Sequence, residues 1–198
     1  MPYESWLNFM HPFHYNSNAC FHLLLHLEKP EELFLDHIRQ SGYAESRIKQ
    51  QLSIPGSRFF PEFVSDIQSL ITRLNEYQSS VTLEANGNLR ITGQVDLKCF
   101  PRGAGTNAVI PVDKLTDHQK SNLFLQRNRG YHIQHLHVTS LPSTKHFMVF
   151  VKPLKKGHQF ITAFPGEASM PMPHHGMKPS LFEACKTFWD NHLVLVKE

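Results

Sequence analysis

The spacing of hydrophobic residues changes near residue 80 from helical steps of three and four to alternation. Before this point, apolar stripes follow residues that commonly begin helices, such as Asn16-Ser17-Asn18 and Pro30-Glu31-Glu32. The pattern predicts four helices: Asn16 to near Lys29, Pro30 to near Ser41, Ala44 to Leu52, and a longest, core helix opened by Pro61-Glu62 and continuing through Leu74.

Alternating apolar positions predict strands over the following half of the chain. The run from Val81 to Leu97 alternates around Asn86-Gly87, which is typical of a β-hairpin. A short strand over Ala108–Val112 and a capped segment from Thr116 to Gly130 come next. Three longer strands and an amphipathic C-terminal helix complete the pattern: Tyr131–Thr139, His146–Lys152, His158–Phe164 and a helix begun by Pro179-Ser180.

These elements predict an α+β fold in which N-terminal helices pack on one face of an antiparallel β-sheet, with a C-terminal helix. With 198 residues and 40% hydrophobic content, the chain is long enough to bury one substantial core. We therefore expect a single domain over 1–198, mainly helical over 1–78, mainly β over 79–173 and helical again over 179–196.

The composition of the chain limits which partners and which cellular location we expect. The formal net charge is only +3, so a nucleic-acid partner must be argued from local residues and not from a global basic field. The three cysteines form no CxxC pair, which argues against a disulfide framework and favours a reducing, cytoplasmic location. The apolar run from Ala19 to Leu27 is short and carries two histidines, so we expect no signal peptide and no membrane partner.

A candidate site emerges if the three late strands pair with one another in order, as their short connections favour. Alternation then places one apolar face against the helices and leaves a second face with histidines, a lysine, a threonine and aromatic rings. We predict the catalytic residues of this second face to be His135, His137, Lys152, His158 and Thr162, beside Phe150, Phe160 and Phe164.

Such a set matches the needs of a metal-independent endoribonuclease. His135 or His137 would take the 2′-hydroxyl proton, and His158 or the other histidine of the HxH pair would protonate the leaving oxygen. Lys152 would bind phosphate, with Thr162 as a hydrogen-bond donor. Aromatic stacking and phosphate contacts predict an RNA-binding set of Lys120, Arg127, Arg129, Phe150 and Phe160.

Two other classes of function stay open. The first is a non-enzymatic protein whose histidine-rich face binds a partner. The second is a metal enzyme, in which the HxH pair shares an ion with His158, His174 or His175. A cupin motif fails because no glutamate lies within a few residues after HxH, where Thr139 to Thr144 stand. A two-histidine phosphoesterase fails because HVTS has no second copy. We expect no cofactor.

The layout of helices followed by a sheet with His, Lys and the Thr-bearing strand Ile161-Thr162-Ala163-Phe164-Pro165 resembles a group of small ribonucleases and toxins. That group includes barnase, EndoU-type nucleases, colicin tRNases and RelE-type toxins, and the resemblance covers roughly residues 60 to 173. It implies a toxin- or effector-like ribonuclease with His135 or His137, Lys152 and Thr162 at the matched positions. It also implies RNA and an inhibitor or immunity protein as partners.

We expect the purified chain to cleave total RNA in EDTA, since this chemistry uses no metal ion. The His135→Ala/His137→Ala variant should lose cleavage by about 10²-fold or more, the usual contribution of general acid–base catalysis. A denaturing gel measures both. Cleavage that EDTA abolishes would instead indicate the metal enzyme, and no cleavage by either protein would favour the binding protein.

Overall fold

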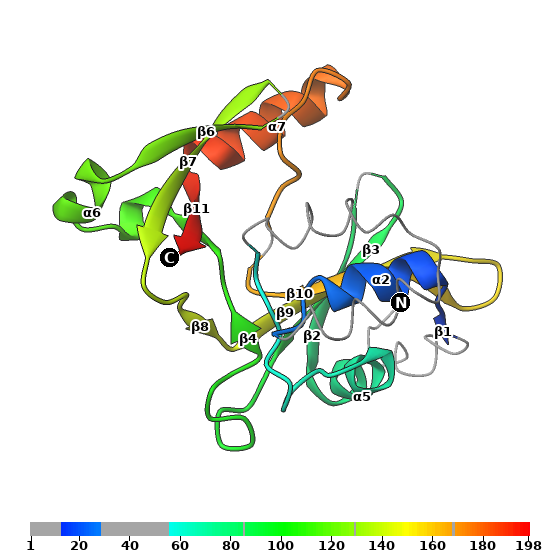
Figure 1. Cartoon of the computed structure of the whole chain (residues 1–198). Coiled ribbons are helices and arrows are strands. Elements are labelled where there is room, and N and C mark those ends of the chain that lie inside the picture. The colour runs from blue at the N-terminus through cyan, green and yellow to red at the C-terminus, as the bar shows by residue number, and fades with distance from the viewer. Residues whose placement is uncertain (1–12, 29–55, 85, 129, 168) are drawn as a thin grey trace. The chain divides into compact units, whose positions relative to one another are not determined.

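The computed structural model describes residues 13–28, 56–84, 86–128, 130–167 and 169–198. The chain divides into two compact units, each built from separated stretches of sequence (Figure 1). Unit 1 comprises residues 1–106 and 143–166, and unit 2 comprises residues 107–142 and 167–198. The described residues form both helices and strands, so the chain is mixed α+β, and most of its strand pairs are antiparallel. One domain over 1–198 stays a prediction.

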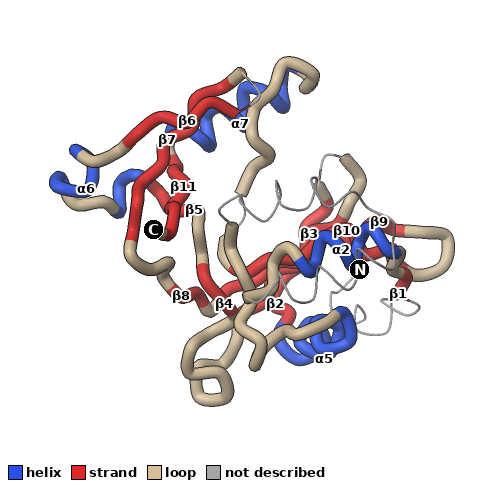
Figure 2. The backbone as a smooth tube through the Cα atoms, viewed as in Figure 1, coloured by secondary structure: helices blue, strands red, loops and turns tan. Residues whose placement is uncertain are grey.

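Unit 1 is built on a five-stranded sheet in the order β1-β10-β9-β3-β2. All pairs are antiparallel except β1 with β10. Helix α2 lies against β10, and α5 lies against β2 and β3 (Figure 2). A small ladder joins β4 to β8. The element bounds are β1 Phe13–His14, α2 Ser17–Leu24, α5 Ile67–Tyr77, β2 Gln78–Leu83, β3 Leu89–Gln94, β4 Gly105–Thr106, β8 Ser143–Thr144, β9 His146–Pro153 and β10 His158–Pro165.

Both helices begin at a side-chain cap. The sequence predicted the cap of α2 correctly but placed the start of α5 too early. Asn16 Oδ1 accepts from the backbone N–H of Ala19 at 2.9 Å and begins α2, as predicted. Helix α5 begins only after Asp66, which forms a capping box with Ser69. The predicted start at Pro61-Glu62 is therefore wrong, because those residues form a turn before the true cap.

One face of the unit 1 sheet, here called the core face, packs against both helices. On β9 the predicted apolar set is confirmed, since Phe147, Val149 and Val151 are fully buried. Leu23 of α2 and Leu70 and Leu74 of α5 belong to the same cluster. The cluster includes rings in edge contact, with Phe63 and Phe147 centroids 5.2 Å apart. Burial of these side chains is the main stabilising term for unit 1.

A β-bulge interrupts the pairing of β10 with β9. Phe160 pairs with Val151 and Thr162 pairs with Phe150, so Ile161 has no opposite partner. Because the extra residue shifts the alternation, Phe160 and Ala163 both lie on the core face, on either side of the bulge. Thr162 and Phe164 lie on the opposite face.

The hairpin predicted around Asn86-Gly87 is confirmed. Strands β2 and β3 pair with Leu83 opposite Leu89, and Gly87 has a φ of 81° that the tight turn requires. The predicted alternation runs too far, however. Leu83, beside the turn, and Leu97, at the end of the pattern, are 70% and 50% exposed.

Unit 2 has a four-stranded sheet in the order β5-β11-β7-β6, with β11 parallel to β7 and the other pairs antiparallel. Ile133 and Val194 pack on one face against Trp189, whose indole N–H lies 3.1 Å from the carbonyl oxygen of Met170. Leu136 and Leu195 pack with Leu115 on the other. The bounds are β5 Val109–Pro111, η2 Val112–Lys114, α6 Asp117–Ser121, β6 Phe124–Asn128, β7 Tyr131–Val138, α7 Pro179–Asp190 and β11 His192–Lys197.

Several predicted elements change type in unit 2. The capped segment from Thr116 begins α6 as expected, but residues 124–128 form a strand that makes a hairpin with β7. The C-terminal helix begins at Pro179 and ends at Asp190, since residues 192–197 enter the sheet as β11. The helices predicted from Pro30 and Ala44 lie outside the described residues.

The expected pairing of the three late strands with one another is wrong. Both hydrogen-bonding edges of β7 are occupied, one by β6 and the other by β11. Since a strand has only two such edges, β7 has none left for β9. Strands β9 and β10 do pair antiparallel as expected, and β9 takes β3 on its other edge.

Gly93 should be intolerant of a side chain. A Cβ there would overlap the Phe147 ring and lie 2.9 Å from the Tyr77 carbonyl oxygen. We expect Gly93→Ala to lower the free energy of unfolding by about 2 to 3 kcal/mol through overpacking, measured by urea unfolding. Gly87→Asn is the control, because no atom lies within 4 Å of a Cβ there and asparagine tolerates the positive φ. Equal losses would contradict this packing.

Candidate functional site

The structure divides the five predicted catalytic residues between the two units. His135 and His137 lie on β7 in unit 2, whereas Lys152, His158 and Thr162 lie on β9 and β10 in unit 1. The premise that one sheet face carries all five is therefore wrong. The catalytic role of each residue stays a prediction.

The bulge corrects the placement of two residues within unit 1. His158 and Phe160 were expected on the polar face. They pair with Pro153 and Val151 instead and lie on the core face, where they are 7% and 1% exposed. Phe160 belongs to the hydrophobic cluster, where its ring contacts Phe13 at 5.9 Å. A ring so deeply buried has no free surface on which a base could stack.

The opposite face of the unit 1 sheet, here called the polar–aromatic face, keeps the other predicted residues together. Across the strands, Arg90 pairs with Phe150 and Phe150 with Thr162. Directly opposite residues share a face, so these three side chains are neighbours. The face comprises Ser80 and Thr82 of β2, Arg90, Thr92 and Gln94 of β3, His146, Met148, Phe150 and Lys152 of β9, and Gln159, Thr162 and Phe164 of β10.

Two aromatic rings form the centre of this face. Phe150 and Phe164 stack with centroids 5.9 Å apart and an interplanar angle of 24°. Both rings and Thr162 are partly exposed, whereas Met148 beside them is buried. The accessible part of the face therefore runs from Phe164 through Phe150 toward the exposed Lys152.

The charges on this face are mainly positive. Lys152 is exposed, and no ion pair joins it to any carboxylate in the described parts of the chain. Arg90 is partly neutralised, since its Nε lies 3.1 Å from Glu84 Oε1. This contact compensates part of the charge as an ion pair, although its two atoms do not meet in hydrogen-bond geometry.

In unit 2, both histidines of the HxH pair contact the Phe124 ring. His137 is exposed and stacks on Phe124 at 4.7 Å, and His135 contacts the same ring at 5.5 Å. His135 is buried, and burial lowers its pKa, with the nearby His137 acting in the same direction. Its Nδ1 lies 2.9 Å from the carbonyl oxygen of Ile133, so Nδ1 carries the hydrogen and Nε2 is the free acceptor.

The predicted phosphate-binding cations also lie in unit 2. Lys120 is on α6, where its ammonium lies 3.8 Å from Asp117 Oδ1, and Arg127 is exposed on β6 opposite His132. Arg129 lies outside the described residues. These cations therefore belong to a different unit from Lys152, Thr162 and the Phe150 ring.

Sequence reasoning missed His26, which lies just after α2 in unit 1. Its Nδ1 is 2.9 Å from the Ser57 carbonyl oxygen, and its ring contacts Phe164 at 5.6 Å. Burial lowers its pKa to about 4. The hydrogen bond to Ser57 raises the pKa, whereas the positive charges of His22 and Arg58 lower it further. A histidine inside the apolar run from Ala19 to Leu27 was the available signal, but Ser57 is too distant in sequence to be foreseen.

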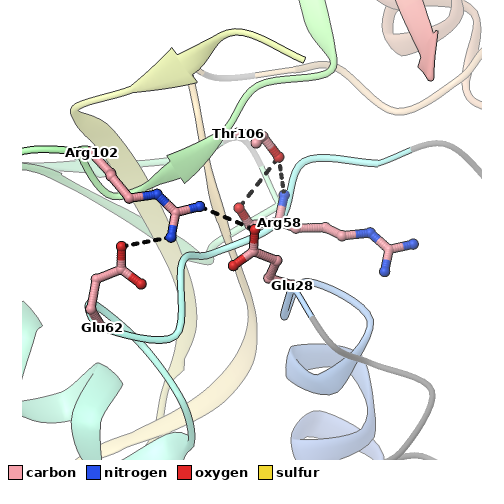
Figure 3. Close-up of polar contacts among 5 residues, drawn as sticks. All are labelled: Glu28, Arg58, Glu62, Arg102 and Thr106. Atoms are coloured by element: carbon pink, nitrogen blue, oxygen red, sulfur yellow. Dashed lines mark hydrogen bonds and ion pairs between the residues drawn. The ribbon is translucent and has the colours of Figure 1, made fainter. Parts of the chain in front are cut away.

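Arg58 stands beside His26 as a second missed residue. Its backbone is held by Thr106, whose N–H donates to the Arg58 carbonyl oxygen at 2.8 Å and whose Oγ1 accepts from the Arg58 N–H at 3.2 Å. The nearby carboxylates of Glu28 and Glu62 both bind Arg102, at 3.1 and 2.9 Å, while the Arg58 guanidinium points away from them (Figure 3). Partial burial lowers the pKa of Arg58, although an arginine stays charged.

Neither a metal site nor a membrane span is found in the part of the chain that the structure describes. No group of three or more His, Cys, Asp or Glu side chains there is placed to hold a metal ion. Likewise, none of the described helices combines the length and apolar character needed to cross a bilayer.

Comparison with known proteins does not identify a family. No protein-family model matches the chain, and no curated protein matches it. Two chains of solved structures match, among them a conserved hypothetical protein from Toxoplasma gondii ME49. That match has a TM-score of 0.43 and 10% sequence identity, and it covers 69% of this chain and 89% of the other. A likeness of this size supports no inference about function.

The lowered pKa of His26 should make unit 1 sensitive to acid. The unfolded histidine titrates near 6.5 and the folded one near 4, so between these values the unfolded chain binds a proton that the folded chain does not. Stability is therefore lost as the pH falls from 6.5 to about 4. The loss from this one group should be about 2 to 3 kcal/mol.

His26→Asn tests this, because the asparagine amide keeps a donor for the Ser57 carbonyl but does not titrate. Urea unfolding followed by circular dichroism at several pH values should show a smaller acid loss in the variant than in the wild type. Identical pH dependence in the two proteins would show that His26 is not the acid-sensitive group.

Proposed function

We propose that this protein binds single-stranded nucleic acid on the polar–aromatic face of unit 1. The observation that carries the proposal is the stacked pair Phe150 and Phe164, partly exposed on a sheet whose other face holds the hydrophobic core. Partly exposed rings on an antiparallel sheet are a common platform for unpaired bases, because every base has a stacking face.

The surroundings of the ring pair suit a nucleic-acid backbone. Lys152 continues the face along β9 as an exposed cation, and Arg90 lies directly beside Phe150. Thr162, on the other side of Phe150, offers a hydroxyl for phosphate or sugar. Aromatic, cationic and hydroxyl side chains are thus neighbours on this face.

Binding is better supported by this geometry than cleavage. The endoribonuclease hypothesis required two histidines on the same face as Lys152 and Thr162. His158 instead lies on the core face, and His135 and His137 lie in the other unit. Metal-independent cleavage therefore stays a prediction from the sequence. The alternative, a non-enzymatic binding protein, is supported by the partly exposed Phe150–Phe164 pair.

Removing the central ring should weaken binding. We expect Phe150→Ala to raise the Kd for a fluorescein-labelled oligouridylate by about fivefold to 50-fold, the usual effect of losing one base–aromatic stack. Phe150→Leu should lose nearly as much affinity, because leucine keeps apolar volume but offers no ring. Fluorescence anisotropy at fixed salt measures both.

The matched control is Phe188→Leu in unit 2, where Phe188 stacks on His192 at 3.8 Å and is likewise partly exposed. This change should leave the Kd unaltered. Wild-type affinity in Phe150→Ala, with an unchanged circular dichroism spectrum, would refute the proposed face. An equal loss in Phe188→Leu would point to unit 2 instead.

A further inference from the structure

His26 presents a hydrogen-bond acceptor next to the proposed binding face. The Ser57 carbonyl oxygen only accepts, so the hydrogen that joins it to His26 must sit on Nδ1. The other ring nitrogen, Nε2, is then unprotonated and carries a lone pair. Because the pKa of His26 is lowered to about 4, this neutral form persists throughout the physiological range. His26 as a residue keeps part of its surface exposed, so it is not sealed in the core.

A continuous line of rings joins His26 to the centre of the face. The His26 and Phe164 centroids lie 5.6 Å apart, and those of Phe164 and Phe150 lie 5.9 Å apart. A base stacked on the Phe150–Phe164 pair would therefore have its sugar and phosphate within reach of either end of the line. Lys152 lies toward one end and His26 lies at the other.

Arg58 supplies a cation at the His26 end. It follows Ser57 in the chain, and its positive charge is felt by His26. Its backbone position is set by three hydrogen bonds with Thr106, and Figure 3 shows the two that the Thr106 hydroxyl makes. Among the described residues no carboxylate pairs with Arg58, since Glu28 and Glu62 are engaged by Arg102. A partly desolvated guanidinium that none of the described carboxylates neutralises is well suited to bind a phosphate.

We propose that His26 and Arg58 form a ribose–phosphate subsite that makes the polar–aromatic face selective for RNA over DNA. His26 Nε2 accepts a hydrogen bond from a ribose 2′-hydroxyl, and Arg58 binds the adjoining phosphate. This rests on the proposed binding of single-stranded nucleic acid to the same face. The 2′-hydroxyl is the group by which a protein distinguishes RNA from DNA at a given site, and a neutral imidazole nitrogen is a suitable acceptor for it.

The two residues should contribute differently. Deoxyribose has no 2′-hydroxyl, so His26 should affect RNA binding and leave DNA binding unchanged. Arg58 contacts a phosphate that both polymers share, so its loss should weaken both. It should also reduce the slope of log K against log salt by about 0.7, the value for one phosphate contact on a single strand.

The test compares a labelled oligouridylate with the oligodeoxyuridylate of the same length, by anisotropy in EDTA, with the oligomers shown intact on a denaturing gel. Wild type should prefer RNA by about fivefold, the usual effect of one hydrogen bond. His26→Asn should bind both polymers with the DNA affinity of the wild type. His26→Gln, whose carbonyl oxygen reaches the position of Nε2, should restore part of the preference.

Controls separate the subsite from general effects. His118→Asn changes an exposed histidine of α6 and should keep the full preference. Arg58→Met should weaken binding to both polymers, whereas Lys98→Met removes an equal charge from an exposed position of unit 1 and should change the salt slope less. Unchanged DNA affinity in His26→Asn also shows that the variant still folds.

The outcomes distinguish failure of the inference from failure of the proposed function. Equal wild-type affinity for RNA and DNA, or an RNA preference that survives in His26→Asn, would overturn the RNA-selective subsite and leave nucleic-acid binding intact. Binding to neither polymer would overturn both. A preference lost in His26→Asn and partly recovered in His26→Gln supports the subsite.

Discussion

The register of β10 against β9, with its bulge at Ile161, determines what both faces of the unit 1 sheet contain. Ahead of the bulge, Phe160 points into the core opposite Val151, and after it Ala163 does the same opposite Val149. Without the extra residue, either Phe160 or Ala163 would have to leave the core, at a cost of lost apolar burial. The same shift brings Thr162 beside Phe150 and stacks Phe164 on it. The candidate site is thus a product of the packing of the core.

Hydrogen-bonding capacity explains why the histidines of the late strands are separated. Strand β7 is bounded on both edges and β9 likewise, so each is an interior strand of its own sheet. Apolar residues on both faces of β7, such as Ile133 and Leu136, fit that interior position. A strand with hydrophobic residues on both faces belongs between two packed layers, and alternation alone does not show which strands will flank it.

Local signals in the sequence therefore predicted local structure well. The caps at Asn16 and Thr116, the Asn86-Gly87 turn and the buried face of β9 all depend on residues close together in the chain. The bulge, the entry of residues 192–197 into a sheet and the bond from His26 to Ser57 depend on partners far away. For the candidate site, Lys152, Phe150 and Thr162 were predicted to share one face, but which of them touch was not. His26 and Arg58 were not predicted there at all, because no periodicity relates them to β10.

The central place of β11 in the unit 2 sheet has a consequence for the order in which the protein assembles. Strand β11 separates β5 from β7, yet it is synthesised after every other described strand. On the ribosome, β6 and β7 can form their hairpin early, whereas β5 has no neighbour until residues 192–197 emerge. The sheet strands of unit 1 are complete some thirty residues sooner, by Pro165. Nascent chains would therefore carry a formed unit 1 sheet while one edge of β7 is still unpaired. That unpaired edge is the surface a chaperone would need to protect.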